Sequence, residues 1–164
     1  MDFLVWLEQT SIGTWVRESP TIWAYPTVLF LHTLGLGIVV GVSSAVDVRI
    51  LGFASGVPLT PLKKLFPLMW VGFGINAFSG TLLLIADAST KLINPVFWVK
   101  MVLIALAVVT IQALNRQVFR NPLIDQIPMP MNGKILAGIS LLLWAGAVTA
   151  GRLMAYIGPV SGLQ

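Results

Sequence analysis

The chain of 164 residues contains no cysteine, a single histidine and few charged side chains. The missing cysteine excludes disulfides, thiolate metal ligands and thiol nucleophiles. Only 10% of the residues are charged and 57% are hydrophobic, so polar side chains could not cover a globule of this size. The basic residues behind the net charge of +4 stand singly or in pairs, and no basic cluster points to nucleic acid. We therefore expect the chain to be dissolved in lipid.

Four stretches reach the roughly 20 apolar residues that a membrane-spanning helix needs. They cover about residues 22–46, 65–86, 96–115 and 135–157, and turn residues separate them in "SGVPLTP", "INP" and "NPLIDQIPMPMNG". The pattern predicts an all-α integral membrane protein, a four-helix bundle that uses residues 1–164 as one membrane domain.

A short amphipathic segment, about residues 2–18, precedes the first span. It lacks the basic start and the small-residue cleavage site of a secretory signal, so we expect a retained helix in the membrane interface. Its expected lipid-facing residues are Phe3, Trp6, Leu7, Ile12, Trp15 and Val16, and its expected water-facing residues are Asp2, Glu8, Arg17 and Glu18.

The distribution of basic residues predicts the orientation, because cytoplasmic loops are enriched in lysine and arginine. The first and third connections carry Arg49, Lys63, Lys64, Arg116, Arg120 and Lys134. Outside the spans, the opposite side has only Arg17 and Lys91. We therefore expect both termini on the outer face, which is periplasmic if the protein sits in a bacterial inner membrane.

Small residues recur every fourth position in two spans, at Gly37, Gly41 and Ala45 and again at Ala147 and Gly151. Such spacing lets helix backbones approach closely, and we expect these residues to form packing contacts. The first set also points away from His32, which favours a homo-oligomer or a subunit of a larger membrane complex.

Every predicted span has an ionisable residue in its outer half. With a rise of 1.5 Å per residue, His32 lies about 15 Å below the outer surface, Lys100 about 6 Å and Arg152 about 8 Å, while Asp87 marks the outer end of the second span. Intramembrane charges are costly and usually face the bundle interior. Lys100 and Arg152 are shallow enough to reach the headgroups instead, whereas His32 is not.

Polar neighbours for His32 are predicted on two helices. Asn76, Gly80 and Asp87 share one face of the second span with Ser79 beside them, and Tyr25 lies two turns before His32. His32 is therefore either a neutral histidine that hydrogen-bonds Asn76 or Tyr25, or a ligand to a cofactor.

A single imidazole without cysteine or a buried carboxylate cannot build a zinc or di-iron site. Haem is compatible with one histidine, because the porphyrin supplies four nitrogens and the protein only the axial ligands. We expect one haem b in the outer half, with His32 on the iron, Lys100 and Arg152 near the propionates, and Tyr25 and Asn76 in the site. A second axial ligand would be Lys100, Met101, Met154 or a group from another subunit.

Three families share short motifs with the chain. "LHTLGLGIVVGVSSAVDVRILG" (31–52) resembles a stretch of uncharacterised bacterial four-helix membrane proteins. "SGTLLLIADASTKLINPVFWVKMVLIALAVVTIQALNRQ" (79–117) is similar to the copper-resistance D family. The order His32, Arg49, Lys100 resembles the HemJ-type membrane protoporphyrinogen oxidases. The likeness covers the first three spans and hardly the fourth.

The oxidase resemblance implies haem b, with His32 as axial ligand, Lys100 as second ligand or propionate partner, and electron transfer with a quinone or tetrapyrrole. The copper-resistance resemblance implies metal uptake, but the outer His- and Met-rich segments are missing, and the pair Met129 and Met131 lies on the inner side. A non-catalytic anchor subunit is the further alternative. Transport would need a polar path through both leaflets, and we expect no such path in the inner half. Asp47 and Arg49, at the inner end of the first span, are interpreted as a salt-bridged turn that locks the first loop. Whether the chain is catalytic stays open.

Overall fold

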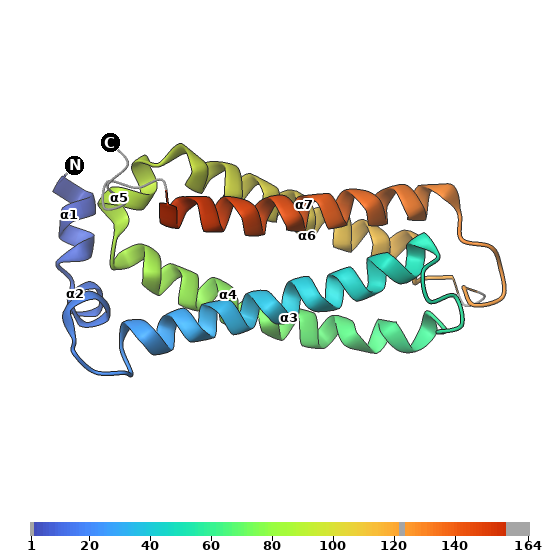
Figure 1. Ribbon diagram of the computed structural model, residues 1–164, viewed down its shortest axis with the longest axis horizontal. Coiled ribbons are helices and arrows are strands. Elements are labelled where there is room, and N and C mark those ends of the chain that lie inside the picture. The colour runs from blue at the N-terminus through green and yellow to red at the C-terminus, as the bar shows by residue number, and fades with distance from the viewer. Residues whose placement is uncertain (1, 122–123, 157–164) are drawn as a thin grey trace.

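The computed structural model describes residues 2–121 and 124–156, and this part of the chain is helical without strands (Figure 1). Four of its helices are long and apolar enough to cross a membrane, which confirms the predicted fold class. The elements in chain order are α1 (Asp2–Glu8), α2 (Ser11–Glu18), α3 (Tyr25–Leu51), the 3-10 helix η1 (Thr60–Leu65), α4 (Phe66–Ile85), α5 (Ala88–Ile93), α6 (Pro95–Gln117) and α7 (Met131–Tyr156).

Proline and glycine set the ends of the first long helix. Pro26 occupies the first turn of α3, where its missing N–H costs no hydrogen bond. Gly52 ends the helix in the left-handed region with φ 107°, which glycine adopts readily. The helix thus runs five residues past the predicted boundary at 46 and includes Asp47 and Arg49. The last predicted boundary, at 157, lies outside the described residues.

The four long helices form two antiparallel hairpins, α3 with α4 and α6 with α7, joined mainly along α3 and α7. Helices α4 and α6 do not pack closely along their lengths, although their side chains share the main core. Figure 1 shows α3 and α7 lying close at the end that carries the loops after α3 and α6, and diverging toward the end that carries α1, α2 and α5. We call these the loop end and the N-terminal end. The main core lies toward the loop end and includes Val46, Ile50, Leu114, Ala137 and Trp144.

Two glycines allow a close contact between the long helices α3 and α4. A Cβ on Gly35 would lie 2.7 Å from both the Asn76 nitrogen and the Gly72 oxygen. A Cβ on Gly72 would lie 2.6 Å from a methyl group of Ile38. This contact brings the backbone of α4 next to the face of α3 that carries His32.

The predicted packing at Gly37, Gly41 and Ala45 is wrong within this chain. All three residues are exposed, and nothing lies within 4 Å of a Cβ placed on either glycine. The core-facing stripe of α3 instead contains Gly35, Val39, Ser43, Val46, Asp47 and Ile50. In α7, Ala147 is buried as expected, and Gly151 lies against Lys100.

The amphipathic N-terminal segment forms two short helices and not one. Thr10 separates them by capping α2, since its side chain accepts a hydrogen bond from Gly13 N. Two residues, Val16 and Glu8, also lie in surroundings that differ from those predicted for them. Val16 is fully buried against Val28, Leu83 and Ala86. The side chains that reach the surface toward lipid include Phe3, Trp6, Ile12 and Trp15.

Glu8 connects the N-terminal helices to the bundle, whereas it is predicted simply to face water. Its carboxylate accepts a hydrogen bond of 2.6 Å from Ser89 N at the start of α5 and lies 3.7 Å from the Arg17 guanidinium. The hydrogen bonds from Ser89 hold the pKa of Glu8 below its usual value, with Arg17 adding to the effect. The N-terminal helices are thereby fixed to the same end of the bundle as His32.

At the loop end, Arg49 and Asp125 hold the connections by backbone hydrogen bonds. Arg49 donates to the carbonyl oxygens of Ser55 and Val57, and Asp125 accepts from the backbone N–H groups of Leu59 and Thr60. The Thr60 hydroxyl and these N–H groups lower the pKa of Asp125. Arg49 therefore does lock the first loop, but Asp47 is not its partner, and the predicted salt bridge is wrong.

We predict that Gly35→Ala destabilises the protein by about 1–3 kcal/mol, the usual cost of overpacking a well-packed contact. The new methyl group would meet backbone atoms, which cannot rotate away, so α3 and α4 would have to separate. Thermal unfolding in detergent micelles measures the effect. Gly74→Ala is the matched control on the partner helix α4, where nothing lies within 4 Å of the added carbon, and should not lower the unfolding temperature. Equal stability of both variants would contradict the α3–α4 contact described here.

Candidate functional site

His32 lies in the second turn of α3, half-buried, and faces α4. Its Nδ1 atom is 3.1 Å from the backbone oxygen of Asn76, 3.3 Å from the Ser79 hydroxyl and 3.4 Å from the Asn76 side-chain nitrogen. The Asn76 side chain also donates a 2.7 Å hydrogen bond to the His32 carbonyl oxygen. Three polar side chains from two spans are thus brought together, as the sequence predicts for Asn76 and Ser79.

The neighbours of Nδ1 determine which ring nitrogen carries the proton. The Asn76 carbonyl oxygen can only accept. Ser79 already donates its hydroxyl proton to the Ile75 carbonyl at 2.6 Å, and the Asn76 amide donates at shorter range to the His32 carbonyl. The shortest contact of Nδ1 is thus to a group that only accepts, and on this ground we assign the proton of the neutral imidazole to Nδ1. This leaves Nε2 with a lone pair and no hydrogen-bond partner among the described residues.

Gly80 completes the support for the ring. A Cβ at this position would lie 3.0 Å from His32 Cε1 and 3.3 Å from Nδ1. The imidazole thus packs directly on the backbone of α4, one turn beyond Asn76. A ring N–H bonded to a backbone carbonyl is an arrangement that metal-ligating histidines commonly use.

Two lysines bring positive charge to the N-terminal end. Lys100 on α6 packs against α7, where its ammonium lies 3.7 Å from a Cβ placed on Gly151. Lys91 donates a 2.6 Å hydrogen bond to the Leu83 carbonyl and lies 3.7 Å from Asp87. Burial lowers the pKa of Lys91, and Asp87 opposes this shift. These two lysines, on α5 and α6, lie at the same end of the bundle as His32.

The structure does not bring the other predicted residues into the site. Tyr25 is 48% exposed, and the hydrogen bonds of His32 go to α4. Arg152 is exposed and makes no ion pair within the described part of the chain, although it follows Gly151 and so lies at the level of Lys100. Met101 is also exposed, at 44%. Asp87 is a helix-end residue that precedes α5.

A second buried polar cluster, which the sequence analysis missed, lies between α3 and α7. Asp47 is 1% exposed and Ser140 is fully buried. The Ser43 hydroxyl is 3.3 Å from Asp47 Oδ2 and 3.3 Å from the Ser140 hydroxyl. The expectation of an inner half without buried polar groups is therefore wrong. The available signal was the spacing of Ser43 and Asp47, which places both on one helix face.

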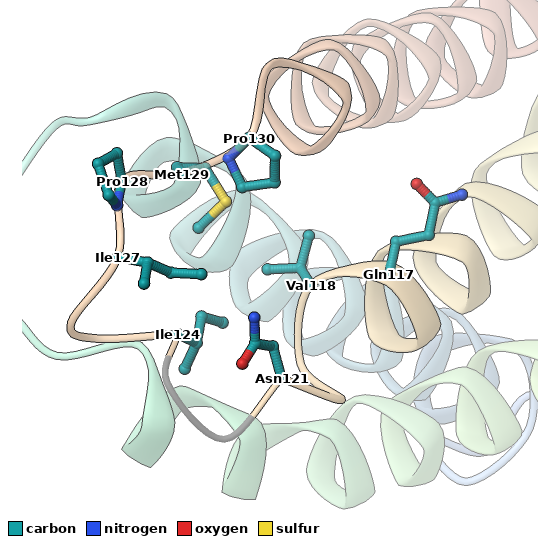
Figure 2. A pocket seen from close by; sticks show the side chains of 8 residues that line it. All are labelled: Gln117, Val118, Asn121, Ile124, Ile127, Pro128, Met129 and Pro130. Atoms are coloured by element: carbon teal, nitrogen blue, oxygen red, sulfur yellow. The ribbon is translucent and has the colours of Figure 1, made fainter.

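The two cavities described by the structure do not contain His32. One, of about 40 Å³, lies at the loop end among Val118, Ile124 and Met129 (Figure 2), and has room for water only. The other, of about 400 Å³, is an open groove on the exposed face of α3 beside Phe30 and Gly37. Met129 and Met131 at the loop end are remote from the histidine, as predicted. The described residues contain no group of three His, Cys, Asp or Glu side chains that could hold a metal ion.

The chain matches no protein-family model, no curated protein and no solved structure. The resemblances read from short motifs therefore stay predictions, and the function has to be argued from His32 and its surroundings.

We predict that Gly80→Ala displaces the imidazole, because the new methyl group would lie 3.0 Å from Cε1. The ring must move away from Asn76 and Ser79 or α4 must shift, so the proton resonance of the Cε1–H group should change. One-dimensional NMR measures this resonance without overlap from other histidines, since the chain has only one.

Gly74→Ala is the control on the same helix, where nothing lies within 4 Å of the added carbon, and its histidine spectrum should match the wild type. An unchanged resonance in the Gly80 variant would show that the ring does not pack on α4.

Proposed function

We propose that the chain is a small membrane haem b protein that serves as an electron-transfer or oxidoreductase subunit. The observation that carries the proposal is the hydrogen bond from His32 Nδ1 to the Asn76 carbonyl. It fixes the tautomer in which Nε2 is the free lone pair, and an imidazole in this state is the common axial ligand of haem iron.

The donor set of the site fits haem better than a bare metal ion. One imidazole nitrogen suffices for an axial bond because the porphyrin supplies the remaining four nitrogens. Lys100 would pair with a propionate or provide the second ligand, and Arg152 follows Gly151, which lies against Lys100. When bound, haem would supply a one-electron redox couple.

The residues of the chain would then have separate tasks. Asn76 and Ser79 keep the Nδ1 proton in place, which orients the ring and keeps Nε2 unprotonated. The Gly80 backbone bounds the ring on the α4 side. The apolar residues around the site would exclude water, and the half-buried Lys100 would offset the negative propionates.

The orientation, compartment and partners belong to the same proposal. The basic residues Arg49, Lys63, Lys64, Arg116, Arg120 and Lys134 lie in or next to the two connections at the loop end. This asymmetry favours a cytoplasmic loop end and a periplasmic N-terminal end, in a bacterial inner membrane. A quinone or tetrapyrrole would exchange electrons with the haem. The exposed Gly37/Gly41/Ala45 face would pair with a second copy or with another subunit.

A structural anchor subunit is the second candidate, and one observation favours it. The hydrogen bonds among His32, Asn76 and Ser79 already join α3 to α4 without any cofactor. Interhelical hydrogen bonds in membrane bundles contribute on the order of 0.6 kcal/mol each. In this reading, His32 stabilises the first hairpin and binds nothing else. No comparable observation favours a copper site.

The optical spectrum of the protein purified from haem-supplemented cells separates the two candidates. We expect a Soret band with one haem per chain, lost in His32→Ala because the axial ligand is gone. Thr33→Ala changes the neighbouring exposed residue and should keep the full spectrum. Lys100→Ala should retain the band but release haem faster.

A colourless wild-type protein that is folded by circular dichroism would favour the anchor subunit. Full haem content with an unchanged spectrum in His32→Ala would exclude His32 as the ligand.

A further inference from the structure

The polar cluster between α3 and α7 is independent of the His32 site. Asp47 lies 15 positions after His32 on the same helix, about 22 Å along its axis. The cluster lies on the α3–α7 contact that joins the two hairpins, next to core residues such as Val46 and Trp144. Its role must therefore be derived from its own chemistry.

Asp47 has no counter-ion. The structure shows no ion pair to its carboxylate within the described residues, and its own helix offers only Arg49, which bonds the first loop. Helix α4 has no ionisable residue, and α2 lies at the opposite end of the bundle. On α7, Lys134 precedes Ser140 by six residues, about 9 Å along the axis, and Arg152 and Tyr156 are farther away.

The hydrogen bonds at Asp47 do not satisfy an ionised carboxylate. Such a group has about four lone-pair positions, and here Oδ2 receives one 3.3 Å hydrogen bond from Ser43 while buried Oδ1 has no partner. An uncompensated buried charge costs several kcal/mol, so a buried group of this kind neutralises instead. The carboxyl is therefore expected to carry a proton.

A metal cation fits the cluster less well than a proton. Hard cations such as Ca²⁺ or Mg²⁺ take about six or more oxygen ligands, whereas Asp47, Ser43 and Ser140 provide only three side chains. Trp144, one turn from Ser140 on the same helix, has a buried indole N–H without a partner among the described residues. An indole N–H is not a cation ligand, so Trp144 adds none to the cluster.

We propose that Asp47, with Ser43 and Ser140, forms an intramembrane proton-binding site on the α3–α7 contact. Asp47 lies one turn before the end of α3 at Leu51, so a modest separation of the hairpins at the loop end would admit water. The carboxyl O–H would then pass its proton to a water molecule and leave a carboxylate and a hydronium ion. Reclosure of the contact requires the proton to return.

Infrared spectroscopy of the purified full-length protein tests the site. At neutral pH we expect the C=O stretch of a protonated carboxyl group, shifted by D₂O and lost completely in Asp47→Asn. This variant keeps the shape of the side chain and should remain folded. Asp87→Asn removes an exposed carboxylate and should keep the band. In the wild type, strongly alkaline buffer should abolish this band. It should also separate α3 from α7, which the distance between spin labels on the two hairpins measures.

A wild-type spectrum without this band would overturn the proposal, as would a band that survives in Asp47→Asn. The proposal would also be overturned if Asp47 were ionised and its infrared signal, or the thermal stability of the protein, differed between sodium and choline buffers. That result would assign the cluster to a cation. Should Asp47→Asn fail to fold, the alkaline titration of the wild type decides alone, and a contact that persists after loss of the proton contradicts the site.

Discussion

The hydrogen bond between His32 and the Asn76 backbone is the interaction on which the proposed site depends. Lipid offers no hydrogen-bond partners, so a polar side chain at this depth must find them on a neighbouring helix. Gly35 and Gly72 make this possible because they let α3 and α4 approach until backbone atoms are in contact. The same approach places Gly80 under the ring. The close packing of α3 against α4 therefore determines the hydrogen bonding of the imidazole.

The division of the bundle into two hairpins explains why the polar groups form two clusters. The first lies within the α3–α4 hairpin, at His32, Asn76 and Ser79. The second lies on the contact between the hairpins, at Ser43, Asp47 and Ser140. A change at the second cluster would alter how the hairpins meet, while the first would keep its internal hydrogen bonds. Proton binding and cofactor binding can thus be tested separately.

Hydropathy and turn residues were enough to predict the four spans, because a helix of some 20 apolar residues has few alternatives in lipid. Asn76 was one of two hydrogen-bond partners predicted for His32, the other being Tyr25, because it lies on the polar face of the second span. The direction in which each side chain points was harder to predict from the sequence. The regular Gly37, Gly41 and Ala45 spacing looked like a packing face but is exposed, whereas the single Gly35 makes the contact. Asp47 was placed at a helix end because the boundary of α3 was set five residues too early. Tyr25 and Lys100 differ in burial although both had been placed near His32, and only tertiary packing decides this.

Nitrogen NMR of the protein labelled at histidine tests the central claim most directly, since the chain contains one imidazole. The haem-free protein in micelles at neutral pH should show a protonated Nδ1 and an unprotonated Nε2, with Nδ1 coupled across the hydrogen bond to the α4 carbonyl. Addition of haem should then shift the Nε2 resonance far more than that of Nδ1. A proton on Nε2 in the haem-free protein would contradict the account, because the nitrogen proposed to bind iron would not be available.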